Sequence, residues 1–285
     1  MMKRNHDAAE LIWDAPFPLL RMHGSGCSSF LHGQTSARVD GCSDGDLIQA
    51  CWLNATGRVQ ALLEIRLTTD GADVLVLSGE IDRVASGFDR VIFPADQVRL
   101  GEQGQQRRMQ RLQAGKAPEL NQVVWLDANA DPPPSWTDRS PCNPAELECW
   151  RNKQGWPLGH QELTGDTNPF ELGLSRWVDL NKGCYLGQET VAKLASRGGV
   201  KQELRCWQST AEGCLDLESG DQLSLNDSRA GLITSVCNDS ATGHCFGLAF
   251  VRRQALDAET LLAGTSGVEV SISRPSAFCE PPSRG

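Results

Sequence analysis

The chain has 285 residues, of which 40% are hydrophobic and 22% are charged, a balance that is ordinary for a globular protein and argues against a disordered one. Its formal net charge of −9 at pH 7 argues against broad affinity for nucleic acid or for anionic membranes. There is no apolar signal-peptide core, and no apolar run approaches the roughly 18 residues of a spanning helix. We therefore expect a soluble, cytoplasmic protein with no membrane and no nucleic-acid partner.

Three strand-like runs lie between residues 47 and 77. Leu47 to Leu53 is largely apolar, and Val59 to Thr69 places apolar side chains at alternate positions, as expected of partly buried strands. A third run, Asp73 to Leu77, follows a turn signal. The short link from Asn54 to Gly57 predicts that the first two runs form a β-hairpin.

Two helices are expected beside these strands. Ser25 to Gln34 has apolar residues at helical spacing, with Ser25 as the expected N-terminal cap. Glu80 to Arg90 carries its apolar residues on one helical face. Helices and strands that are mixed in this way indicate an α+β fold.

The middle of the chain is more polar. Residues 101–121 are rich in Gln and Arg, and we expect a solvated loop or sheet edge there, with a basic rim for an anionic ligand as the alternative. A short buried strand is expected at Val123 to Leu126 and a rigid loop at Asp131 to Ser135. Pro144 to Gln154 predicts a helix, because proline suits the first helical turn.

After residue 199 the pattern changes to short strands that are separated by Gly, Asn and Asp turn signals. Even spacing of short strands indicates a small barrel or sandwich. The tail, residues 276–285, is expected to fray. The expected strands are Glu203 to Thr210, Gln222 to Leu225, Ala230 to Val236, His244 to Val251 and Val268 to Ser273.

Eleven cysteines are spread along the chain. None forms a Cys-x-x-Cys pair and no Cys/His spacing matches a common zinc site, so we expect no metal site. Their number is odd, and the chain is much longer than a typical disulfide mini-domain. We therefore expect most of them, apart from Cys184, to be buried apolar side chains of a protein in a reducing compartment.

Cys184 lies in the densest cluster of special residues, the segment Lys182-Gly-Cys-Tyr-Leu-Gly-Gln-Glu189. Gln188 to Ala195 has the spacing of a helix, so the cysteine precedes a helix N-terminus, where free N–H groups and the helix dipole favour an anion. Lys182 adds a nearby cation, and both effects favour the thiolate form of Cys184. The residues alone leave two interpretations open: a reactive thiol, or a glycine-rich turn that leads into a surface helix.

The segment from Lys182 to Glu189, continued by Ala192-Lys193 and Arg197-Gly198, resembles the signature of the YgfZ family. That family is related to the folate-binding T protein of the glycine cleavage system. Weaker similarities to the same family lie at Gly24 to Gln34, Leu53 to Val59 and Asn168 to Glu171.

The resemblance implies two α+β, ferredoxin-like units around a central channel and a C-terminal antiparallel β-barrel. We expect these units at residues 1–120, 121–199 and 200–285. The resemblance also implies a tetrahydrofolate-binding accessory protein that supports iron–sulfur cluster assembly or repair. Its cofactor would be tetrahydrofolate or a derivative, and its partners would be cluster-assembly or client proteins.

Three kinds of residue are expected at the site that the resemblance implies. Cys184 is the reactive group, for thiol exchange or for contact with a cluster. Glu171 is the candidate for the pterin ring, because a buried carboxylate can accept hydrogen bonds from the adjacent amino and N–H groups of that ring. Phe170 and Trp177 are candidates for an apolar wall beside the ring.

Cations and polar side chains complete the expected cofactor site. The cations that would meet the anionic glutamate tail of folate are Arg58, Lys193 and Arg197. The motif side chains expected to bind the cofactor are Lys182, Tyr185, Gln188 and Glu189, of which Glu189 also suits a helix start in its own right.

Other functions remain open at this point. The main alternative is a tetrahydrofolate-dependent, aminomethyltransferase-like enzyme, but Asn54 stands where the similar hairpin motif has aspartate, and a neutral amide cannot act as a general base. A cysteine hydrolase would need a histidine partner, and none of the five histidines lies in an evident motif. A scaffold without chemistry is the remaining interpretation.

Overall fold

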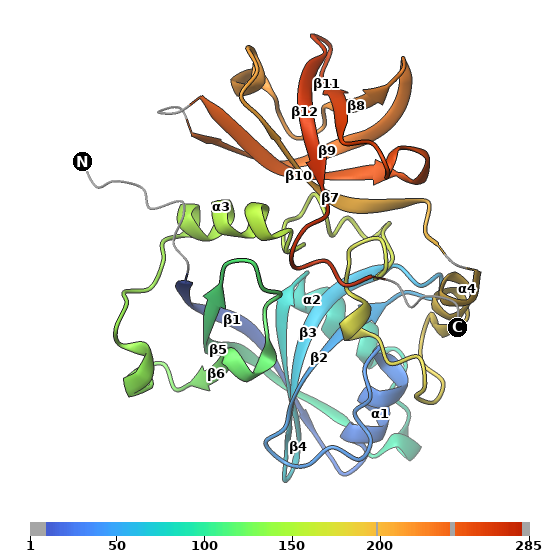
Figure 1. Ribbon diagram of the computed structural model, residues 1–285. Helices are drawn as coiled ribbons and strands as arrows, with labels where there is room; N and C mark the ends of the chain where they lie inside the picture. The colour runs from blue at the N-terminus through green and yellow to red at the C-terminus, as the bar shows by residue number, and fades with distance from the viewer. Residues whose placement is uncertain (1–9, 198, 240–242, 281–285) are drawn as a thin grey trace.

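The computed structural model describes residues 10–197, 199–239 and 243–280, which form a mixed body with a β-barrel packed against it (Figure 1). The sheet of the body has six antiparallel strands in the order β2-β3-β4-β1-β5-β6. The long strand β1 lies near its centre, between β4 and β5. The strands are β1 (Glu10–His23), β2 (Leu47–Leu53), β3 (Val59–Thr68), β4 (Gly71–Ser78), β5 (Arg99–Gln113) and β6 (Val123–Leu126).

Helices α1 (Cys27–Gln34) and α2 (Ile81–Asp89) share an apolar core with alternate residues of β3 and β4 on one face of the sheet. Phe30 of α1 and Phe88 of α2 meet edge to face, with ring centroids 5.5 Å apart. Phe88 is fully buried, and full burial of such a side chain contributes about 1.5–3 kcal/mol. The alternation of side chains along the strands therefore fixes which face receives the helices.

The opposite face of the sheet packs against the second half of the chain. Trp13 and Leu62 of the sheet belong to one core with Trp150 of α3 (Pro144–Gln154) and with Phe250 of the barrel. The Asn143 side chain caps α3 by accepting hydrogen bonds from two backbone N–H groups, each at 3.0 Å. This core joins the body to the barrel and leaves the residues between α3 and α4 (Gln188–Arg197) between the two parts.

The C-terminal part is a closed antiparallel barrel with the strand order β10-β7-β12-β11-β8-β9. Its own core consists of inward-facing residues such as Trp207, Ile233 and Val270. The strands are β7 (Gln202–Ser209), β8 (Gln222–Leu225), β9 (Ser228–Asp239), β10 (His244–Arg252), β11 (Thr260–Ala263) and β12 (Val268–Ser273).

The predicted α+β class and the C-terminal barrel are confirmed. Four elements, β2, α3, β8 and β12, begin and end at the predicted residues. Strand β6 also lies where expected, although its side chains are half-buried rather than buried. The division into units at residues 120 and 199 stays a prediction.

Of the solvated loop or sheet edge expected at residues 101–121, the loop is wrong, whereas residues 101–106 do lie at a sheet edge, because β6 pairs with β5 at 107–110. Most of this segment belongs to β5, which pairs with β1 from one end to the other. Arg108 in the middle of β5 is fully buried, and its guanidinium donates two hydrogen bonds of 2.7 Å to the carboxylate of Glu64. Buried charges persist when they are paired in this way. Because its partner Glu64 lies in β3, the sequence around Arg108 does not indicate that this side chain is buried.

Other expectations at the ends of elements also need correction. Ser25 does not cap α1: Gly26 occupies the N-cap position, and the Ser25 hydroxyl donates to the Gln97 side chain at 2.7 Å. The tail is not frayed as far as Glu280, since Phe278 is buried and the Cys279 N–H donates to the Gly173 carbonyl at 2.9 Å. Residues 281–285 lie outside the described part of the chain.

The cysteines follow the expectation only in part. Cys149 of α3 and Cys237 of β9 form a disulfide between the body and the barrel, which the cysteine spacing did not predict. Among the free cysteines of the described residues, Cys184 alone is classed as exposed, and the others are buried or half-buried.

Candidate functional site

Two glycines hold the signature segment against the β2–β3 hairpin. Gly57 of the hairpin and Gly187 of the signature have φ angles of +72° and +81°, which favour glycine. A Cβ atom on Gly187 would lie 2.5 Å from the Asn54 carbonyl oxygen and 3.0 Å from the Cα of Gly57. A close backbone contact therefore accounts for a glycine in each of the two segments.

Lys182 fastens the signature segment to the end of α1. Its buried ammonium donates hydrogen bonds to the carbonyl oxygens of His32, Thr35 and Ala37, the last two at 2.6 Å. Burial lowers the pKa of Lys182 to about 8, because desolvation disfavours the charged form. All three donors of the ammonium meet backbone carbonyls, and the expected role of Lys182 in binding the cofactor stays a prediction.

Tyr185 and Gln188 also support the local structure. The Gln188 side-chain oxygen accepts a hydrogen bond from the Tyr185 backbone N–H at 3.3 Å. The buried Tyr185 ring lies 4.8 Å from the Lys182 ammonium, and its hydroxyl has no hydrogen-bond partner in the described part of the chain. Desolvation raises the pKa of this hydroxyl. The two side chains thus shape the turn before α4 rather than an open surface.

Cys184 is exposed and lies just before α4, as the sequence predicts. The neighbouring Gly183 lies beside the His32 ring, because a Cβ on this glycine would be 3.6 Å from the His32 Nε2. The Nδ1 atom of His32 accepts a hydrogen bond from the Asp40 N–H at 3.1 Å. Sequence reasoning missed this imidazole, which comes from α1 and not from the signature segment.

Glu171 is a fully buried carboxylate with one unused oxygen. Its Oε2 accepts a hydrogen bond from the Asn168 N–H at 3.1 Å and lies 3.6 Å from the Arg58 guanidinium. Its Oε1 is buried and finds no hydrogen-bond partner among the described residues. Burial raises the pKa of Glu171, while Asn168 and Arg58 act in the opposite direction. An acceptor in this state is suited to a ligand that brings a donor.

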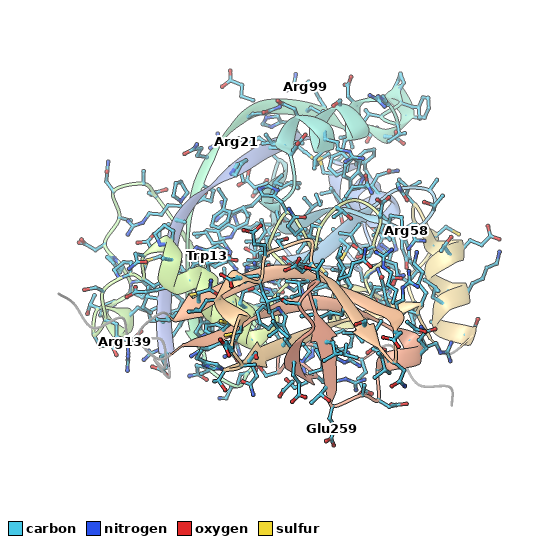
Figure 2. The ribbon with its side chains drawn as sticks, turned by 90° about the horizontal axis from the view of Figure 1, so that it is seen from above. Trp13, Arg21, Arg58, Arg99, Arg139 and Glu259 are labelled. Atoms are coloured by element: carbon cyan, nitrogen blue, oxygen red, sulfur yellow. A yellow bond between two sulfur atoms is a disulfide. The ribbon has the colours of Figure 1, made fainter. Side chains whose placement is uncertain are left out.

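A cavity of about 480 Å³ adjoins Glu171. Leu194 of α4 and Val200 supply apolar walls, and the charged side chains on it among the described residues, besides Glu171, are Arg58, Lys201 and Arg253. Figure 2 places Arg58 on the side of the molecule that carries α4. The cavity therefore has walls from the hairpin, from α4 and from the start of the barrel. Lys201 and Arg253 were missed, because each becomes part of the site only where the barrel meets the body.

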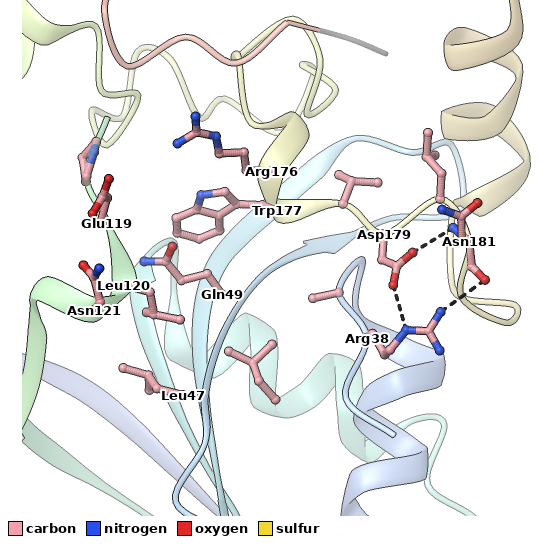
Figure 3. Close-up of a pocket in the computed structure, with 15 residues that line it drawn as sticks. Arg38, Leu47, Gln49, Glu119, Leu120, Asn121, Arg176, Trp177, Asp179 and Asn181 are labelled. Carbon is pink, nitrogen blue, oxygen red and sulfur yellow. Dashed lines mark hydrogen bonds and ion pairs between the residues drawn. The ribbon is translucent and has the colours of Figure 1, made fainter. Parts of the chain in front are cut away.

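The two aromatic candidates line other surfaces. Trp177 lies on a groove of about 940 Å³, together with Gln49 and Glu119, as Figure 3 shows. Phe170 lines an adjoining hollow of about 720 Å³. Neither is among the residues that line the Glu171 cavity. The described structure therefore does not bring the expected aromatic wall and the expected carboxylate to one cavity.

The charged side chains of α4 that were expected to bind the cofactor are not among the described residues that line the Glu171 cavity. The carboxylate of Glu189 and the ammonium of Lys193 pair with each other at 2.6 Å on an exposed face of the helix. The cavity is lined by the neighbouring positions Thr190 and Leu194. Arg197 is the last residue of α4, and its side chain lies outside the described part of the structure.

Asn54 has a structural task in the hairpin. Its side-chain oxygen accepts hydrogen bonds from the backbone N–H groups of Thr56 and Arg58, each at 3.0 Å. It also accepts one from the Thr56 hydroxyl at 2.8 Å. These bonds hold the turn that carries Gly57 and Arg58, and they leave the amide without a proton-accepting role.

The packing of a mixed body against a closed barrel is the fold of a solved aminomethyltransferase T protein. The chain matches the glycine cleavage system aminomethyltransferase T from Bartonella henselae with a TM-score of 0.67. The match covers 99% of this chain and 90% of that protein, at 14% sequence identity. At this identity the likeness establishes the fold alone.

Sequence similarity points to the same group of proteins. A chloroplastic protein of Arabidopsis thaliana that carries a provisional transferase designation is 35% identical over 116 residues, which are 40% of this chain and 26% of that protein. The aminomethyltransferase of Corynebacterium aurimucosum is 25% identical over 158 residues, or 50% of this chain and 39% of the enzyme. The matches thus span well under half of each of these relatives, and no protein-family model matches the chain.

Two other features are absent from the described residues. None of their helices has the length and apolar character that crossing a membrane requires. No cluster of three or more His, Cys, Asp or Glu side chains in the same residues is arranged to hold a metal ion.

Proposed function

We propose that the chain binds a reduced folate, with the pterin ring in the Glu171 cavity. The observation that carries this proposal is the unused, buried Oε1 of Glu171. A pterin presents an amino group and a ring N–H side by side, and a carboxylate can accept both hydrogen bonds. Such a ligand would supply the donor that the folded chain lacks at this position, and so reduce the cost of burying the carboxylate.

The remainder of the cavity suits the same class of ligand. Small-molecule sites are mostly apolar with a few polar groups that set orientation, and here Leu194 and Val200 lie beside one carboxylate. Arg58, Lys201 and Arg253 put positive charge on the same cavity. The carboxylates of the glutamate tail would lie toward these side chains.

Thermal unfolding with and without reduced folates tests this proposal. A ligand at 100 times its dissociation constant stabilises a protein by about 2.7 kcal/mol, so the unfolding midpoint should rise for the wild type. Glu171→Gln should remove most of the rise, because the amide presents one acceptor and a competing donor. Glu119→Gln, in the groove beside Trp177, is the matched control and should respond like the wild type. If the folate-induced rise of the unfolding midpoint is lost in Glu119→Gln and kept in Glu171→Gln, the folate binds in the groove beside Trp177 and not in the Glu171 cavity.

We further propose that the protein uses Cys184 in folate-dependent support of iron–sulfur cluster assembly or repair. The exposure of this thiol before α4 supports the proposal, as does its place in the segment that resembles the YgfZ signature. The test is complementation of cells that lack the gene, scored by the activities of iron–sulfur enzymes. Cys184→Ser should fail to restore them and Cys42→Ser should succeed. Full rescue by Cys184→Ser would show that the Cys184 thiol is not required for this function.

An aminomethyltransferase-like activity is the second candidate. Similarity to the aminomethyltransferase of Corynebacterium aurimucosum and the shared fold favour it. The hydrogen bonds that occupy the Asn54 side-chain oxygen count against it, because that position offers no general base. Assay of the purified protein with a lipoylated, aminomethyl-bearing carrier and tetrahydrofolate decides between the two. Turnover that exceeds the protein-free rate would promote this candidate.

A further inference from the structure

The disulfide between Cys149 and Cys237 joins the two parts of the molecule whose junction forms the Glu171 cavity. Cys149 lies in α3 of the body and Cys237 in β9 of the barrel, 88 residues apart in sequence, with Cα atoms 5.8 Å apart. The bond therefore spans the interface between the parts and closes a long loop of chain. A cross-link of this kind restricts the unfolded chain more than a short-range one does.

The contacts next to the disulfide include buried polar side chains. Arg151 of α3 donates hydrogen bonds of 2.9 Å to Glu162 and to the Ser235 hydroxyl of β9, and that hydroxyl donates to Glu162 at 2.6 Å. Asn152 is fully buried, and its side-chain oxygen finds no partner within the described ranges. Buried polar contacts of this kind add little net stability, because their gain is offset by desolvation. The covalent bond therefore adds a tie between α3 and the barrel beyond the apolar core that the two share.

The Glu171 cavity is lined by residues of both parts of the molecule. Glu171, Arg58 and Leu194 belong to the body, whereas Lys201 and Arg253 come from the start of the barrel unit and from the turn after β10. A shift of the barrel on the body would move the second group away from the first. A covalent bond between α3 and the barrel limits such a shift, in addition to the hydrogen bond of 2.8 Å that the Leu204 N–H of β7 donates to the Glu171 carbonyl.

We propose that Cys149 and Cys237 form a redox clamp that sets ligand affinity at the Glu171 cavity. Oxidation removes two protons and two electrons from the two thiols, and the electrons reduce the disulfide of a dithiol oxidoreductase to its dithiol. In exchange chemistry the half-exposed Cys149 thiolate attacks the oxidoreductase disulfide and expels one of its thiolates. The Cys237 thiolate then attacks the Cys149 sulfur and expels the second. Reduction by the dithiol form runs the same steps in reverse. The effect on affinity rests on the proposed folate function, whereas the clamp itself does not.

The first experiment tests the clamp without a ligand. Protein oxidised by a thioredoxin-type disulfide should be two hydrogens lighter than the reduced form and yield a Cys149–Cys237 cross-linked peptide. Reduction should lower the midpoint of thermal unfolding by about 10 °C and hasten protease cleavage between the body and the barrel. Cys149→Ser should behave as the reduced form under both conditions, and Cys42→Ser should respond like the wild type. Absence of the cross-linked peptide, or equal cleavage of the two forms, would overturn the clamp.

The second experiment measures the affinity of both forms for tetrahydrofolate. The oxidised wild type should bind about tenfold more tightly than the reduced form, a difference of about 1.4 kcal/mol. The same difference should be absent in Cys149→Ser. Equal affinity of the two wild-type forms would show that the disulfide does not affect ligand binding at the Glu171 cavity. If neither form binds the folate, the proposed function fails, and the first experiment still decides whether the clamp exists.

Discussion

Gly57 and Gly187 meet across the contact between the β2–β3 hairpin and the turn before α4, where a Cβ on Gly187 would lie 3.0 Å from the Cα of Gly57. This contact joins two segments that are 130 positions apart in the printed sequence. Arg58 follows Gly57 directly and lies 3.6 Å from Glu171. The glycine pair therefore sets the position of one side of the candidate cavity.

Gly187→Ala should destabilise the protein by about 1–3 kcal/mol, since a positive φ strains a residue with a Cβ, and the close backbone neighbours add to that cost. Urea unfolding measures the change. Gly104→Ala is the control, because a Cβ there would meet nothing within 4 Å, and it should leave the midpoint nearly unchanged. Equal midpoints for the two variants would contradict the interpretation of the contact.

Glu171→Gln should raise the stability of the ligand-free protein at neutral pH. Burial raises the pKa of Glu171 above its ordinary value of 4.5, so between that value and the raised one the folded chain binds more protons than the unfolded chain. Stability from this group is present below pH 4.5 and is lost as the pH rises through the raised pKa. The unfolding midpoint of the variant should exceed that of the wild type at pH 7, and the difference should shrink toward pH 4.5. A difference that is constant with pH would show that ionisation of Glu171 is not its cause.

Arg108→Met should cost about 3–5 kcal/mol, because it leaves the carboxylate of Glu64 buried without its charged partner. The double variant Glu64→Leu and Arg108→Met should recover much of this loss, since it removes both charges. Chemical unfolding of the wild type, the single variants Glu64→Leu and Arg108→Met, and the double variant gives the coupling between the two positions. Additive losses would mean that the pair is not coupled as its two hydrogen bonds indicate.

Cys184 should be the first cysteine to react with iodoacetamide at pH 7.5 in the native protein. Burial raises the pKa of Cys27 to about 11 and those of Cys51 and Cys206 to about 12, and only the thiolate reacts. Cys184, by contrast, is exposed. Peptide mass mapping after a short pulse of iodoacetamide identifies the labelled cysteine. The Cys184→Ser variant should lack this early label. An early label on Cys51 would show that the native core opens on that timescale.

Local sequence determined the elements whose signals are local. The apolar run of β2 and the Asn143-Pro144 start of α3 suffice to fix those elements, because strand alternation and helix capping act over a few residues. The start of α4 was likewise predicted, and with it the place of Cys184 before a helix. Short-range patterns therefore correctly predicted that the signature segment leads into a helix.

Tertiary structure decided which polar side chains are interior and which are available. Arg108 is a core residue because β3 brings the carboxylate of Glu64 to it. Lys182 is buried because the end of α1 places carbonyl oxygens within hydrogen-bond distance of its ammonium. Glu171 meets Arg58, Lys201 and Arg253 only where the hairpin, the segment before α4 and the barrel converge. Burial and pairing of charges depend on contacts between distant segments, and these are set by the packing of the whole chain rather than by neighbours in sequence.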